Sequence, residues 1–306
     1  MNPEICETVE IDPVAGRRAR SRAEAEWFLT RSAASDYCDP AKGEKNWSVV
    51  EGLRDVPTPS GVTVGVRLDA MRGGRALVPC CGLAGVEFVA QDRLGLRVDA
   101  FDLDERILRR AAAGRQMDGI LQFAGDANEV VLEAERYDLI LMIDAAHHVE
   151  DLEHFFGQLN RALRPGGLLV GHEYVGENRI GFFPENMKWI HRIWALIPDE
   201  YKHRECRPAY VASVPAALSP NEGIRCREIP RVARESFRLF HEKRIHAIDW
   251  PIFQRLNLPA DGPGADPAKV REGRMIREWI GLLESFAMDS DLLSGHGMTF
   301  VAEKRS

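Results

Sequence analysis

Residues 75–85 read RALVPCCGLAG, a short apolar run followed by a turn of small residues. The run predicts a buried strand over residues 75–78, and the turn predicts a reversal into a helix that begins near Val86. Small side chains let the backbone of such a turn approach a ligand, and the first amides of the helix can bind a carboxylate or a phosphate. Alone, this turn does not identify the ligand.

The same pattern of strand, turn and helix repeats towards the C-terminus. Further apolar runs predict strands over residues 97–101, 120–124, 137–143 and 168–172. Asp104 is a good N-cap for the second helix, and a helix over 151–163 is expected to stop at Pro165-Gly166-Gly167. Strands that alternate with helices predict an α/β fold with a Rossmann-like, doubly wound and mostly parallel sheet.

The segments on either side of this sheet are predicted to cap and extend it. Residues 1–72 form an N-terminal helical cap, residues 73–174 the Rossmann-like core, residues 175–235 a helical lid insertion after strand five, and residues 236–306 C-terminal strands and a helix that complete the core. The predicted helices and strands in the flanks cover residues 22–31, 185–197, 239–248, 270–288 and 298–303. The helix over 185–197 is expected to be amphipathic, with Trp189 and Trp194 on its apolar side.

Composition narrows the class of partner. The chain has 306 residues and a net charge of −7, which disfavours nucleic acid and favours a small-molecule substrate. No apolar stretch reaches the length of a membrane span, and no signal sequence precedes the core, so a cytoplasmic protein without membrane contact is expected. The six cysteines lack metal spacing and are expected to be free thiols. A homodimer is compatible with the sequence.

Acidic residues follow the second and third predicted strands. Asp102 lies 20 residues after Gly82, a spacing at which a carboxylate can accept hydrogen bonds from the ribose of an adenosine cofactor. Asp126 follows the third strand, where its carboxylate and the next backbone amide could bind an adenine edge. Each aspartate alone could be an ordinary turn residue, but three such turns after three successive strands favour a binding site.

These motifs resemble the class I S-adenosylmethionine (SAM)-dependent methyltransferase family. The resemblance rests on ALVPCCGLAGVEF, AFDLDERIL, FAGDANEV, YDLILMIDAAHHVED and LNRALRPGGLLVGHEY, of which the Leu-Arg-Pro-Gly-Gly turn is the most specific. It implies SAM as cofactor and S-adenosylhomocysteine as product. By this resemblance the methionine part would face Cys81, Gly82 and Ala84, the ribose Asp102 and Leu103, the adenine Asp126 and Ala127, and the pocket mouth Asp144.

Three positions depart from the pattern of that family. The family usually has an acidic residue where this chain has Val78, and glycines where it has Cys80 and Ala84. An alanine at position 84 would cost on the order of 1 kcal/mol if that position required a positive φ. The missing acid at Val78 leaves two alternatives: Glu87 compensates for it, or the affinity for SAM is reduced.

Methyl transfer needs an acceptor atom held in line and can use a base. His148 and Glu173 are the predicted catalytic residues, with His147 and His172 as neighbours, although structural roles are an alternative for each. No metal is expected, because adjacent histidines at a strand end should point apart and H-E-x-x-H is absent. Aromatic residues that could form a lid over the acceptor, or only pack a helix, are Tyr37, Trp47, Phe182, Phe183, Trp189 and Trp194.

The predicted activity is transfer of a methyl group from SAM to an O, N or C atom of a small molecule, in the biosynthesis of a sugar or secondary metabolite. Two alternatives remain at this stage. An NAD(P)-dependent oxidoreductase shares the turn and the acid after strand two, although the turn lacks a full G-x-G-x-x-G. A degenerate methyltransferase-like binding subunit would explain Val78, Cys80 and Ala84.

Overall fold

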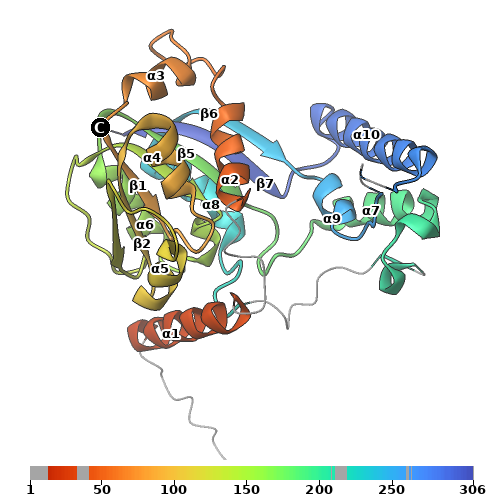
Figure 1. Ribbon diagram of the computed structural model, residues 1–306, viewed down its shortest axis with the longest axis horizontal. Helices are drawn as coiled ribbons and strands as arrows, with labels where there is room; N and C mark the ends of the chain where they lie inside the picture. The colour runs from red at the N-terminus through yellow and green to blue at the C-terminus, as the bar shows by residue number, and fades with distance from the viewer. Residues whose placement is uncertain are drawn as a thin grey trace, which may run out of the picture.

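The computed structural model describes residues 13–32, 41–207, 209–210, 219–259, 262 and 264–305. Within these ranges the central element is a seven-stranded sheet with the order β3-β2-β1-β4-β5-β7-β6 (Figure 1). Its strands are β1 (Arg75–Pro79), β2 (Arg97–Asp102), β3 (Ile120–Ala124), β4 (Tyr137–Ile143), β5 (Leu163–Tyr174), β6 (Phe237–Ile245) and β7 (Gly297–Lys304).

Strand pairing confirms the predicted mostly parallel, doubly wound sheet. The first five strands pair in parallel, and β7 runs antiparallel to both β5 and β6. From β1 the chain adds β2 and β3 on one side of the sheet and then β4 and β5 on the other, so the strand order changes direction between β1 and β4. Ligands of open α/β sheets bind at this switch point, outside the carboxyl ends of the strands.

Helices cover both faces of the sheet because the β1 side chains alternate between two apolar cores. Ala76 and Val78 pack with α2 (Ala41–Gly52), α3 (Val64–Ala70) and α4 (Val86–Leu94) on one face. Leu77 packs on the other face with α6 (Leu152–Ala162) and α8 (Ile229–Ser236). The helix after β2 is α5 (Glu105–Ala112), which packs against α1 (Pro13–Ser32).

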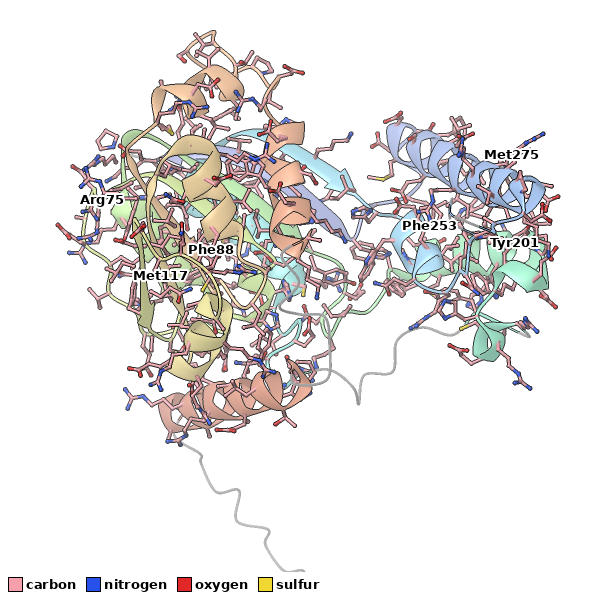
Figure 2. All side chains as sticks on the ribbon, in the orientation of Figure 1. Arg75, Phe88, Met117, Tyr201, Phe253 and Met275 are labelled. Atoms are coloured by element: carbon pink, nitrogen blue, oxygen red, sulfur yellow. The ribbon has the colours of Figure 1, made fainter. Side chains whose placement is uncertain are left out.

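Three helices form a separate unit beyond the sheet. They are α7 (Pro184–Leu196), α9 (Asp249–Phe253) and α10 (Pro267–Asp289), and they share an apolar cluster that includes Ile193, Ile252 and Ile280. Figure 2 shows Tyr201, Phe253 and Met275 in this unit, away from Arg75 and Phe88 in the sheet domain.

Helix α7 departs from its predicted packing. The prediction put Trp189 and Trp194 on one buried side of the helix, which is correct for Trp194 and wrong for Trp189. Trp194 is buried and donates through its indole N–H to the Cys206 carbonyl, whereas Trp189 is 43% exposed. Five residues span 500° on a helix, so the two side chains point about 140° apart.

The first residues of two elements differ from the prediction by five residues or more. Helix α1 begins at Pro13, well before the predicted residue 22, because its arginine- and alanine-rich first half favours helix without an apolar period. Strand β5 begins at Leu163, before the predicted residue 168, and includes the Pro-Gly-Gly turn. Leu163 already pairs with Tyr137, and the register then shifts near Gly166, whose φ is +78°.

None of the helices in the described ranges combines the length and the apolar character that a membrane crossing requires. The four described cysteines, Cys80, Cys81, Cys206 and Cys226, are free thiols as predicted. Cys6, Cys38 and Tyr37 lie outside the described residues.

The close contact of β5 with β7 gives a test of the sheet core. A Cβ at Gly171 would overlap the Phe300 ring, which is fully buried and has no room to move. We expect Gly171→Ala to lower the free energy of unfolding by about 1–3 kcal/mol, measured by urea denaturation.

Gly157→Ala is the matched control, because a Cβ at this exposed position of α6 meets no atom within 4 Å. It should stabilise the protein by about 0.5–1 kcal/mol through helix propensity. Equal stability of the two variants would contradict this packing.

Candidate functional site

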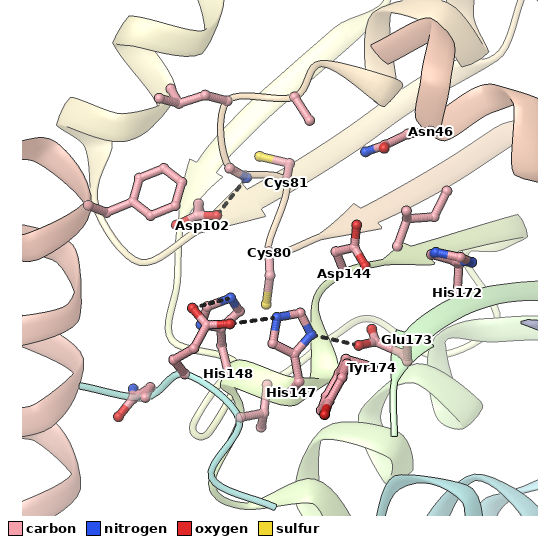
Figure 3. Close-up of a pocket in the computed structure, with 18 of the residues that line it drawn as sticks. Asn46, Cys80, Cys81, Asp102, Asp144, His147, His148, His172, Glu173 and Tyr174 are labelled. Carbon is pink, nitrogen blue, oxygen red and sulfur yellow. Dashed lines mark hydrogen bonds and ion pairs between the residues drawn. The ribbon is translucent and has the colours of Figure 1, made fainter. Parts of the chain in front are cut away.

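A cavity of about 800 Å³ lies at the carboxyl ends of the parallel strands (Figure 3). This volume is within the range of small-molecule sites. All ten residues predicted for the site line this one cavity, and they are Cys81, Gly82, Ala84, Asp102, Leu103, Asp126, Ala127, Asp144, His148 and Glu173. The turns after β1, β2, β3, β4 and β5 therefore meet at one place, as the parallel register requires.

Asp102 is fixed by two backbone amides. Its Oδ2 accepts from the Gly82 N–H at 2.8 Å, and its Oδ1 accepts from the Leu103 N–H at 2.8 Å. Burial raises the pKa of the carboxyl group, although both amides oppose this effect. Each oxygen retains acceptor capacity towards the cavity, so the group can hold two vicinal hydroxyls.

The turn after β1 concentrates its left-handed backbone at Cys80 and the glycines. Cys80 has a φ of +48°, at a position where the family usually has glycine, and Gly82 has a φ of +54°. Ala84 is not among the described residues with positive φ, so the predicted cost at that position does not arise. Burial raises the pKa of the Cys80 and Cys81 thiols well above the usual value, which keeps both groups protonated.

Asp126 and Asp144 follow β3 and β4. The Asp126 Oδ1 accepts from the backbone and side-chain amides of Asn128 at 2.8 and 2.7 Å, which fixes the turn. Asp144 has a φ of +51° and an exposed side chain, and Figure 3 shows it between the Cys80 turn and His172. A carboxylate placed there can receive a cation from the cavity.

Glu87 does not compensate for Val78. Its side chain is fully buried, does not line the cavity, and receives a bond from Gln122 on β3 at 3.3 Å. The other oxygen, Oε2, has no hydrogen-bond partner. The interpretation of Glu87 as a cofactor ligand is therefore wrong, because the first turn of α4 directs it into the protein.

Glu173 is buried and holds the turn of residues 146–148, called the histidine turn because it carries His147 and His148. Its Oε1 accepts from the Ala145 and Ala146 amides at 2.8 and 2.7 Å, and its Oε2 lies 3.0 Å from His147 Nδ1. Burial lowers the pKa of His147, but bonds with Glu173 and Glu222 outweigh burial and raise it well above the usual value.

His148 is held in the same way by a second carboxylate, from helix α1. Its Nδ1 lies 2.9 Å from Glu24 Oε1. Glu24 in turn accepts from the Ser219 hydroxyl at 2.6 Å and the Asn221 amide at 2.8 Å. One buried carboxylate thus joins α1, the histidine turn and the segment after residue 218.

Both imidazoles face Glu222. His147 Nε2 lies 3.4 Å and His148 Nε2 4.0 Å from its carboxylate oxygens, and the ring centroids are 4.3 Å apart. The expectation that adjacent histidines point apart is wrong, because residues 146–148 form a 3₁₀ turn after the strand and not a strand end. Burial opposes ionisation of Glu222, but the His147 bond and both imidazoles lower its pKa to about 2.

Three further imidazoles and two aromatic rings also line the cavity and are called the imidazole wall; its residues are His172, Tyr174, His246, Trp250 and His296. The Asn186 side-chain amide donates to the Ala247 and Ser294 carbonyls at 2.9 and 2.8 Å, and its nitrogen lies 3.2 Å from His296 Nε2. Burial lowers the pKa of His296 to about 4, which keeps it neutral.

The predicted aromatic lid does not line this cavity: Trp47, Phe182, Phe183, Trp189 and Trp194 are absent from its walls. Trp27 and Phe28 of α1 line it instead, together with Glu24. Ser21, Glu24, Ala25 and Phe28 have the spacing of one helix face, a signal that the sequence offered but that the prediction did not use. No comparable local signal marked Glu222 or His246.

The segment that contains these turns is similar to a known protein family. Residues 78–171 match the family described as "Methyltransferase domain". The matched segment runs from β1 to β5 and includes the Gly82, Asp102, Asp126 and Asp144 turns.

Curated relatives align over part of their length. The phthiotriol/phenolphthiotriol dimycocerosates methyltransferase of Mycobacterium leprae is 25% identical over 112 residues, 36% of this chain and 42% of that protein. The malonyl-[acyl-carrier protein] O-methyltransferase of Enterobacter lignolyticus is 32% identical over 104 residues, 34% of this chain and 40% of that protein. The chain therefore spans less than half the length of these relatives.

Solved structures also resemble the chain. The phosphoethanolamine N-methyltransferase 2 of Haemonchus contortus, in complex with S-adenosyl-L-methionine, aligns with a TM-score of 0.46 and 17% identity, over 86% of this chain and 53% of that one.

The buried Glu87 predicts a pH dependence of stability. Burial raises its pKa from 4.5 to about 7, so the folded state keeps a proton that the unfolded state releases between these values. The contribution of Glu87 to stability is therefore largest below pH 4.5 and is lost as the pH rises through 7. We expect Glu87→Gln to remove about 2.5 kcal/mol of the decrease in unfolding free energy between pH 5 and pH 8, measured by urea titrations.

Glu105→Gln is the control, because this carboxylate lies exposed on α5, and it should leave the pH profile unchanged. Parallel profiles for Glu87→Gln and the wild type would contradict the buried, protonated state.

Proposed function

We propose that the chain transfers a methyl group from SAM to an O, N or C atom of a small-molecule acceptor, because residues 78–171 match the family described as a methyltransferase domain. The observation that carries the proposal is the clasp of the Asp102 carboxylate by the Gly82 and Leu103 amides at the edge of the cavity. This is the arrangement that a nucleoside ligand needs at the switch point of an open sheet.

The residues of the cavity fit the parts of SAM in the predicted order. Asp102 would accept the ribose hydroxyls, and the Asp126 and Ala127 turn would receive the adenine. Gly82 supports close approach, because a Cβ there would meet only the Phe28 ring, at 3.6 Å. Asp144 would bind the amino group of SAM, and would so replace the acidic residue that the family usually has at the position of Val78.

SAM supplies a methyl group that its sulfonium already activates, so the protein has to orient the acceptor and exclude water. Helix α1 contributes to that exclusion with Trp27 and Phe28, which line the cavity. The histidine turn and the imidazole wall would contact the acceptor.

The catalytic roles of His148 and Glu173 stay predictions. Glu173 already accepts two amide bonds and faces His147, which favours a positioning role for it. His148 keeps its Nε2 towards the cavity and is the better candidate for accepting a proton from the acceptor.

The acceptor we propose is small and bears heteroatoms, as a sugar or secondary metabolite does. The imidazole and aromatic side chains of the imidazole wall can pack against a ring and bind its hydroxyl or amino groups. A cytoplasmic location and a homodimer stay predictions.

Loss of the Asp102 carboxylate tests the proposal. Asp102→Asn removes the charged acceptor, so we expect the Kd for SAM and for S-adenosylhomocysteine, measured by calorimetry, to rise at least about tenfold.

The control is Asp104→Asn, which preserves the helix cap two residues away and should change the Kd less than about twofold. Wild-type affinity in Asp102→Asn, or a wild-type protein that binds NAD(P) and ignores SAM, would overturn the proposal. Tight SAM binding without any methyl transfer would instead indicate a binding subunit.

A further inference from the structure

Three potential metal ligands converge on the wall of the cavity. His147, His148 and Glu222 each offer one ligand atom, and these atoms lie within 4.8 Å of one another. All three residues line the cavity, and Figure 3 shows both imidazoles directed towards one carboxylate. From this geometry we propose that the cluster binds a divalent transition-metal ion of the zinc or iron(II) class.

The histidines are already oriented as metal ligands are in proteins. Each Nδ1 is bonded to a separate buried carboxylate, His147 to Glu173 at 3.0 Å and His148 to Glu24 at 2.9 Å. A carboxylate on Nδ1 fixes the ring and places the Nε2 lone pair towards the ion, which is the usual outer-shell arrangement of metal-binding histidines. Here that arrangement occurs twice, on neighbouring residues.

The supporting carboxylates are themselves immobilised. Two backbone amides hold Glu173, and the Ser219 hydroxyl with the Asn221 amide holds Glu24. Glu24 is 4% and Glu173 1% exposed, so water does not compete with either carboxylate for the hydrogen bond to its histidine. Both rings are therefore positioned before any ion arrives, which lowers the ordering cost of binding.

The ligand separations fit a small coordination sphere. Ligand atoms at about 2.1 Å from a tetrahedral zinc ion lie about 3.4 Å apart. His147 Nε2 is 3.4 Å from Glu222 Oε1, and His148 Nε2 is 4.0 Å from Glu222 Oε2. All three ligand atoms lie within 4.8 Å of one another, and the Glu222 side chain, which is 19% exposed, has room to adjust towards an ion.

The donor atoms select the class of metal. Two imidazoles and one carboxylate suit zinc, iron(II) and similar ions, whereas magnesium prefers oxygen ligands and retains its water. Charge points the same way, because the carboxylates of Glu24, Glu173 and Glu222 line one pocket with the two imidazoles and attract a cation.

Three protein ligands leave one coordination position open to the cavity. On the proposed function, on which this extension rests, that position would hold an anionic oxygen of the acceptor. His148 would then act as a metal ligand in place of a proton acceptor, so the two roles are alternatives for the same nitrogen.

A second group of residues shows by contrast why the first one fits. His246, Asp249 and Glu284 also lie close together, but Glu284 accepts three backbone N–H bonds, from His246, Ile248 and Asp249. Its oxygens serve a loop connection, and His246 already bonds Asp249. No open ligand set remains there.

The test is calorimetric titration of the chelator-treated full chain with zinc chloride, without SAM. We expect one zinc ion per chain and no heat with magnesium chloride. His148→Gln and Glu222→Gln should each weaken zinc binding more than about 100-fold. Glu24→Gln, which removes the carboxylate that orients His148 and that also bonds Ser219 and Asn221, should weaken it about 10- to 100-fold. His203→Gln, a partly exposed histidine outside the cavity, should bind zinc like the wild type.

Replacement of zinc by cobalt(II) adds a visible absorption band in the wild type that His148→Gln should lose. Circular dichroism of each variant distinguishes loss of a metal ligand from loss of the fold. The test relies on His148, which is partly exposed, because replacement of the buried His147 could prevent folding. Wild-type protein that takes up no zinc, or a zinc affinity in His148→Gln and Glu222→Gln equal to that of the wild type, would overturn the site. SAM affinity, measured separately, shows whether the proposed function fails independently.

Discussion

The parallel pairing of β1 with β2 is the constraint on which the site depends. Residue by residue this register sets the end of one strand beside the end of the other, from Arg75 opposite Arg97 to Pro79 opposite Phe101. The Gly82 amide then meets the Asp102 carboxylate, although 20 residues separate them in the chain. A shift of one residue would reverse the faces of β1 and remove the clasp. The proposed recognition of a cofactor therefore depends on the register of the sheet as well as on the side chain of Asp102.

Beyond the clasp, the cavity is organised by buried carboxylates that orient other groups. Glu173 holds a backbone turn and one imidazole, and Glu24 holds another imidazole and a distant segment. A buried carboxylate is costly unless its oxygens are satisfied, and here bonds from amides, a hydroxyl and histidines meet that requirement. The same bonds make the histidine turn rigid. Whether the turn receives a proton or an ion, its two rings start from fixed positions.

The sequence was informative where the determinants are local. Strands β3 and β4 agree with the predicted boundaries to the residue, since apolar runs bounded by turns leave little freedom, and Asp104 caps its helix as predicted. The site residues after each strand followed from the fold. The rest depends on tertiary contacts: Glu24 meets His148 across 124 residues, and no local pattern announces such a pair. Trp189 was misplaced because helical geometry was not applied to its spacing from Trp194.

Helix α1 closes the cavity, yet much of its attachment is electrostatic and lies near the surface. Arg18 pairs with Glu129, Arg20 with Glu150, and Glu26 with Arg106, all with substantial solvent exposure. Mobile ions weaken such pairs far more than they weaken an apolar core. The enclosure of the ligand, and with it the rate of ligand exchange, should consequently respond to ionic strength, while the sheet beneath remains indifferent to it.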